Sequence, residues 1–294
     1  MSSSDVDRLI DEVVAAGAAA LPGRIVAWYV TGSYADGSAV PGSDLDIVAV
    51  LDGEVGLDED AALRRSRHGL GEPYGIFVDI SARGLVSLRS NGDVAISLRS
   101  RIVAGTDIRP QLRATDMASF RRQMMHAPFL FSTRIRETTE LHCPLAAPDP
   151  TMPFLGYEVC RFLPVGHHDR DTLKDMVAMG CFIATALVAL ETDQPTTSKS
   201  EAVEKYQELR LGPWNELLKA LVEVIRGRWN WRIPQGSEDR EYLLAQCHRL
   251  LEFENEFYDT YAAFLRSERK ASQRGAREYA LNRIARFHHP DVAD

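Results

Sequence analysis

The most constraining feature of this sequence lies between residues 25 and 51, where two β-rich runs flank a glycine–serine turn and a pair of acids. The first run, Ile25–Val30, is followed by Gly32 and Ser33, and the second begins at Asp46, two residues after Asp44. Because side chains alternate across a strand, Asp44 and Asp46 point the same way, about 7 Å apart. Two carboxylates so close repel each other unless a cation lies between them, and Mg²⁺ prefers carboxylate and phosphate oxygens. The segment therefore predicts a site for a metal ion and a triphosphate.

The glycine–serine turn strengthens this interpretation because it follows the first strand directly. Glycine allows the backbone to approach a ligand closely, and the amides after it can hold phosphate oxygens. Ser33 adds a hydroxyl donor. The alternative is a plain hairpin, with Asp44 in the turn and Asp46 on a hydrated face. The apolar run 47–51 disfavours that alternative, because a free charge beside it would be poorly solvated.

A third acid, Asp79, lies inside Gly75–Ile80, which is otherwise an apolar strand. A lone carboxylate in such a run needs a partner. If this strand pairs beside the Asp46 strand, all three acids converge. The alternative places Asp79 on a solvated edge strand.

The rest of the chain predicts two parts with different architectures, together an α+β protein. Residues 1–112 are predicted to form a small mixed sheet flanked by helices, and residues 113–294 a helical bundle. In the first part, helices are expected over residues 5–20 and 58–70, strands over 25–30, 46–51 and 75–80, and a helix with irregular chain over 81–104. In the second part, helices are expected over residues 119–141 (with Pro128 as a possible break), 171–191, 200–209, 213–226 and 239–269, and the basic run 266–274 as a solvated helix end.

Composition narrows the functional classes. The net charge of −8 argues against a surface built for nucleic acid, and is compatible with a cationic substrate or with ordinary solubility. The four cysteines form no CxxC pair, which predicts free, buried thiols in a reducing compartment. Neither a secretory signal nor a convincing membrane span is present in the sequence, so we expect a cytoplasmic protein.

These motifs resemble the DNA polymerase β-like nucleotidyltransferase superfamily, through Gly32-Ser33, Asp44-x-Asp46 and the later strand residue Asp79. The order of parts resembles the bacterial aminoglycoside nucleotidyltransferases, most closely the streptomycin/spectinomycin adenylyltransferases. In the second half the resemblance is looser, and it rests on the long helix and the Pro- and Lys-containing segment 194–203 that follows it.

The resemblance implies roles for individual residues. Asp44, Asp46 and Asp79 would form the catalytic and metal-binding set for two Mg²⁺ ions. Asp79 stands where the antibiotic-modifying relatives have a glutamate base, and its side chain is one methylene shorter. Whether Asp79 is the general base or only a metal ligand is left open. The remaining implied positions are the nucleotide-binding Gly32, Ser33, Ser43 and Lys199, and Asp175 as an acceptor contact.

The implied reaction moves AMP from Mg·ATP to a hydroxyl of a small molecule, such as an aminoglycoside-type antibiotic, and releases pyrophosphate. Two alternatives are a toxin-type nucleotidyltransferase that modifies tRNA or a protein, and a catalytically silent nucleotide-binding member. The acidic balance disfavours tRNA, and the three intact acids disfavour silence. The sequence does not specify the acceptor, the base of the nucleotide or the oligomeric state.

Overall fold

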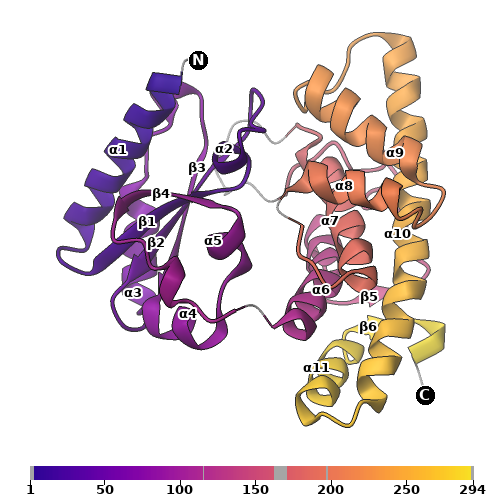
Figure 1. Cartoon of the computed structure of the whole chain (residues 1–294). Coiled ribbons are helices and arrows are strands. Elements are labelled where there is room, and N and C mark those ends of the chain that lie inside the picture. Colours follow the sequence, from indigo (N-terminus) through magenta and orange to yellow (C-terminus); the bar gives the residue numbers. More distant parts are fainter. Residues whose placement is uncertain (1–2, 115, 162–170, 197, 293–294) are drawn as a thin grey trace. The chain divides into compact units, whose positions relative to one another are not determined.

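The computed structural model describes residues 3–114, 116–161, 171–196 and 198–292, which form two compact units, Met1–Phe120 and Arg121–Asp294 (Figure 1). The expected domain boundary between residues 112 and 113 stays a prediction.

The first unit is built on a four-stranded sheet with the order β3-β2-β1-β4. Strand β1 is antiparallel to both β2 and β4, whereas β2 and β3 are parallel. The predicted α+β class with a small mixed sheet is therefore confirmed. The strands are β1 (Ile25–Thr31), β2 (Leu45–Leu51), β3 (Val78–Gly84) and β4 (Ser100–Gly105).

Helices cover both faces of this sheet (Figure 1), and each face has its own apolar core. On one face, α1 (Ser3–Ala20) and α3 (Leu57–Ser66) pack against the Trp28 side of the sheet. On the other face, α4 (Leu85–Asn91) and α5 (Val94–Leu98) pack against a core that contains Tyr29, Val48 and Val50. The alternation of β1 and β2 thus divides their side chains between two hydrophobic layers.

The structure corrects three sequence expectations in this unit. Strand β3 begins at Val78 instead of Gly75, because Gly75 has a left-handed backbone (φ 63°) and ends the 3₁₀ turn Glu72–Tyr74. Residues 81–104 contain the end of β3 and most of a fourth strand, β4, besides the helices α4 and α5. A short helix, α2 (Ser33–Asp36), follows β1 directly. Strand β4 was not expected because its apolar run, Ile102–Ala104, is only three residues long and lies between Arg101 and Gly105.

The second unit is largely helical, as predicted, and the long helix α10 runs along it (Figure 1). Helix α6 passes through Pro128 without ending, and the Tyr258 hydroxyl donates a hydrogen bond of 3.1 Å to the Pro128 carbonyl. Its helices are α6 (Met117–Ile135), α7 (Lys174–Glu191), α8 (Lys199–Glu208), α9 (Asn215–Lys219), a π-helical segment (Ala220–Arg228), α10 (Ser237–Lys270) and α11 (Arg274–Ile284). Further 3₁₀ turns are Arg109–Gln111 in the first unit and Pro290–Val292 in the second.

Two features of the second unit go beyond what the sequence indicated. The basic run 266–274 ends α10 on an exposed surface, as predicted, but a separate helix, α11, begins at its last residue, and Ala276 and Ala280 of that helix are buried. Two short parallel strands, β5 (Leu141–His142) and β6 (Phe287–His288), join parts of the chain that are distant in sequence. Two-residue strands carry no periodic signal, so local sequence cannot indicate them.

The structure also bears on the membrane and on the thiols. Within the part of the chain that it describes, no helix is long and apolar enough to span a bilayer. All four cysteines are free, as predicted. Cys160, Cys181 and Cys247 are buried, as expected, but Cys143 is partly exposed.

Candidate active site

Two of the predicted acids lie side by side at one end of the sheet. Asp46 is the register partner of Asp79 on β3 and of Thr31 on β1. Register partners on neighbouring strands direct their side chains to the same face, and neighbouring strands lie about 4.8 Å apart. By alternation this is the face of Val48 and Val50, which α4 and α5 cover further along the sheet. The sequence predicted that Asp79 would approach Asp46 only if the two strands paired, and β3 does pair beside β2.

Gly32 brings the end of β1 against the Asp46 carboxylate. Its backbone angles, φ 64° and ψ −151°, fall in a region that essentially only glycine occupies. A Cβ atom at this position would lie 2.5 Å from Asp46 Oδ2, closer than side-chain atoms approach. Glycine is therefore required both for the turn and for the space beside Asp46. Ser33 follows immediately as the first residue of α2.

Ser43 closes the turn that precedes β2, and Asp44 lies between that turn and the strand. The Ser43 hydroxyl accepts a hydrogen bond of 2.9 Å from the Val40 amide, and the Ser43 amide donates one of 2.9 Å to the Val40 carbonyl. These two bonds close the turn directly before Asp44. Burial raises the pKa of Tyr34 in α2, and the negative charge of Asp44 adds to that rise. Asp44 therefore lies close enough to α2 to act on it electrostatically.

Arg67 is a site residue that the sequence did not indicate. Its guanidinium Nη1 lies 3.5 Å from Asp79 Oδ1 and donates a hydrogen bond to the main-chain carbonyl of Val78. The Cζ atom of the same guanidinium lies 4.8 Å from the centre of the Phe77 ring. Strand β3 lies at the edge of the four-stranded sheet, so it has a side without a neighbouring strand in that sheet. Burial lowers the pKa of Arg67, and the Asp79 charge opposes this. In sequence, Arg67 is one of several arginines near a helix end, with nothing to distinguish it.

The two remaining predicted residues, Asp175 and Lys199, belong to the second unit. Asp175 is only 2% exposed, and its carboxylate accepts hydrogen bonds from the Arg161 amide (2.7 Å) and the Cys160 thiol (3.2 Å). Lys199 is exposed at the start of α8, with its Nζ 5.7 Å from the centre of the Phe182 ring. Their roles toward the carboxylates of the first unit stay predictions.

Residues 17–91 match the family model of the nucleotidyltransferase domain, a range that includes Gly32, Ser33, Asp44, Asp46 and Asp79. A search of the curated proteins found no significant match.

Among solved structures, the fold is similar to the spectinomycin adenyltransferase from Enterococcus faecialis, crystallised with ATP and spectinomycin. The alignment covers 84% of this chain and 98% of that chain, with a TM-score of 0.51 and 12% sequence identity. At this identity the likeness establishes a shared fold, and the family model identifies the catalytic module. The chain therefore carries a nucleotidyltransferase domain, within a fold shared with a spectinomycin adenyltransferase.

Proposed function

We propose that this protein transfers AMP from Mg·ATP to a hydroxyl of a small, hydroxylated acceptor of the aminoglycoside type, releasing pyrophosphate. The observation that carries the proposal is the register pairing of Asp46 with Asp79, beside a turn that only Gly32 can form. The spectinomycin adenyltransferase of similar fold, solved with ATP and spectinomycin, supports this choice of nucleotide and acceptor. We place the reaction in the cytoplasm.

The residues present fit divalent metal ions. The carboxylates of Asp44, Asp46 and Asp79 are the oxygen ligands that Mg²⁺ prefers, and the missing side chain of Gly32 leaves space beside Asp46 Oδ2. These three residues would hold two Mg²⁺ ions. When bound, such ions offset the charge of the triphosphate and stabilise the attacking and leaving oxygens.

Other residues of the first unit would bind and orient the nucleotide. The first amides of a helix have no partner within the helix, so the start of α2 and the Ser33 hydroxyl can hold phosphate oxygens. Ser43 supports the turn that presents Asp44. The Asp79 side chain is 48% exposed, which leaves it accessible to an acceptor hydroxyl. We propose that Asp79 accepts the proton of that hydroxyl, and Arg67 keeps its carboxylate oriented.

The second unit would contribute charge and acceptor contacts. Lys199 is an exposed cation that could offset charge on the departing pyrophosphate. The buried carboxylate of Asp175 accepts a hydrogen bond from the Arg161 amide. By holding the backbone at Arg161, it would help to form the surface that contacts the acceptor. The division into a nucleotide-binding domain, 1–112, and a helical domain, 113–294, is part of this proposal.

Labelled ATP tests the reaction directly. The protein is incubated with Mg²⁺ and α-³²P-ATP, with a panel of aminoglycosides, spectinomycin and lincosamides, and separately with tRNA and protein. We expect label in one class of small molecule and equimolar pyrophosphate. Label in RNA or protein would instead indicate a toxin-type enzyme, and label in no substrate would contradict catalysis.

The variant Asp46→Asn tests the carboxylate assignment. We expect it to lose transfer by at least about a thousandfold while its unfolding temperature stays close to that of the wild type, because the site and not the core is altered. Asp79→Asn should lower kcat far more than it changes KM for ATP. Asp58→Asn, an exposed acid in the first turn of α3, is the matched control and should remain active. Substantial turnover by Asp46→Asn would rule out the assignment.

A further inference from the structure

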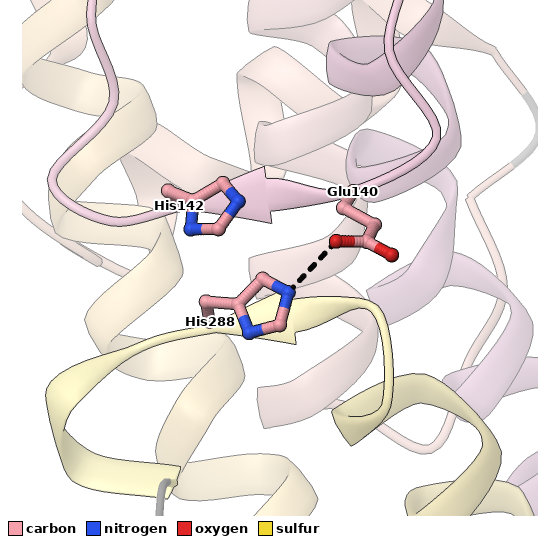
Figure 2. A group of neighbouring side chains, drawn as sticks. All are labelled: Glu140, His142 and His288. Carbon is pink, nitrogen blue, oxygen red and sulfur yellow. Dashed lines mark hydrogen bonds and ion pairs between the residues drawn. The ribbon is translucent and has the colours of Figure 1, made fainter.

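We propose a second metal site, selective for Zn²⁺ over Mg²⁺, formed by Glu140, His142 and His288 in the helical unit (Figure 2). It shares no residue with the proposed nucleotide site, whose carboxylates lie in the first unit.

Backbone pairing brings the two histidines together. Strands β5 and β6 are parallel, with Leu141 opposite Phe287 and His142 opposite His288. Leu141 and Phe287 are buried in the core, so alternation turns both histidines to the exposed face. Glu140 precedes His142 by two residues, and Figure 2 shows all three side chains on the same side of the ribbon.

The ligand atoms are close to metal-binding separations. The Nε2 of His288 lies 3.0 Å from Glu140 Oε2, and the two imidazole rings stack with centroids 4.3 Å apart at 15°. One ligand atom from each residue lies within 4.8 Å of the others. Ligands of tetrahedral Zn²⁺ at bond lengths of 2.0–2.1 Å are about 3.4 Å apart. Stacked rings hold their nitrogens in nearly parallel planes, so a ring must turn about its side-chain bonds to direct both nitrogens at one ion, and the exposure of these side chains leaves room for that turn.

The ligand chemistry favours zinc over magnesium. Imidazole nitrogens suit Zn²⁺, and two histidines with one carboxylate form a three-ligand set that leaves a position for water. Mg²⁺ prefers oxygen ligands throughout, as the aspartates of the first unit offer. An exposed histidine–carboxylate pair contributes little to stability by itself.

The bound ion would act as a cross-link. Glu140 and His288 are 148 residues apart in the chain, so one ion would join the segment after α6 to the segment after α11. A ligand that binds only the folded form shifts unfolding to higher temperature. Zinc should therefore stabilise the helical unit.

Calorimetric titration of the whole, chelator-stripped protein with ZnCl₂ tests the site, with millimolar MgCl₂ present to occupy the aspartates. We expect one Zn²⁺ per chain, micromolar or tighter affinity, and a higher unfolding temperature. His142→Ala and His288→Ala should each weaken binding at least about tenfold and remove the thermal shift. His248→Ala, which removes an exposed histidine of α10, is the matched control and should bind as the wild type does.

Two results would overturn the proposal: no stoichiometric binding, or unchanged binding by both histidine variants. If an alanine variant unfolds at a lower temperature without metal, glutamine at the same position replaces it in the comparison. Asp46→Asn should keep full zinc binding, so that failure of the zinc site and failure of the proposed transferase function give different results.

Discussion

Gly32 is the residue at which backbone conformation and the candidate site are most closely linked. Gly32→Ala would place a methyl group 2.5 Å from Asp46 Oδ2 in a backbone region that alanine avoids. We expect a loss of about 1–3 kcal/mol in the free energy of unfolding and a large loss of transfer. Urea unfolding and initial rates would measure the two effects.

The control for this variant is Gly23→Ala. Gly23 also has a positive φ, 71°, but nothing lies within 4 Å of a Cβ there. This variant should cost about 1 kcal/mol, from backbone strain alone, and should keep its activity. Equal effects of both substitutions on turnover would contradict the role assigned to Gly32.

Arg67 gives a second prediction at this scale. Arg67→Gln removes the cation 3.5 Å from Asp79 Oδ1, and leaves that carboxylate without the group that orients it. We expect kcat to fall about tenfold, as for loss of one positioning contact, while KM for ATP changes little.

Steady-state kinetics of Arg67→Gln and of Arg274→Gln would test this. The control variant breaks an exposed pair with Glu278 in α11 and should leave kcat unchanged. A rise in KM for ATP without a change in kcat would instead place Arg67 in nucleotide binding.

Among the elements, the contact of α6 with α10 includes a partly buried histidine, His126. His126 Nδ1 lies 2.7 Å from the Tyr261 hydroxyl, and the His126 ring stacks on Phe129. Burial, helped by the charges of Arg283 and Arg286, lowers the pKa of His126 to about 4. The folded protein therefore keeps this imidazole neutral in a pH range where the unfolded chain protonates it.

This difference predicts a pH dependence of stability. Unfolded histidine has a pKa of about 6.5, so the contribution is complete above that pH and is lost as pH falls toward 4. Between pH 7.5 and pH 5 we expect a loss of about 2 kcal/mol. Urea unfolding should show this loss in the wild type and in the control His248→Gln, but not in His126→Gln. An equal loss in all three proteins would contradict the assignment.

The sequence predicted the strands that have a local apolar signal, but not how the strands pair. Strands β1 and β2 were predictable because Val30 and Ile47–Leu51 lie in continuous apolar runs. The acid pattern indicated Asp46 and Asp79 as site residues, but their alignment depends on the pairing of β2 with β3. Neither this pairing nor the approach of Arg67 is encoded by neighbouring residues.

For the whole molecule, the surplus of acidic groups affects encounters with charged ligands. With a net charge of −8, the protein should attract a polycationic acceptor at long range. We expect kcat/KM for such an acceptor to fall severalfold as ionic strength rises from about 0.01 to 0.15 M, where the Debye length shortens from about 30 to 8 Å. The kcat/KM for Mg·ATP, which is anionic, should not fall in parallel. Equal declines for both substrates would point to a general effect of salt.

The parallel alignment of β2 and β3 limits how a sequence of this kind can diverge by insertion or deletion. Residues added at the exposed turn His68-Gly69 would lengthen a surface connection between α3 and β3 and leave the carboxylates in place. A single residue added inside β3 ahead of Asp79 would turn that side chain to the opposite face, among the apolar groups under α1 and α3. We therefore expect insertions in the His68-Gly69 turn before β3 to preserve activity, and insertions from Val78 onward to abolish it.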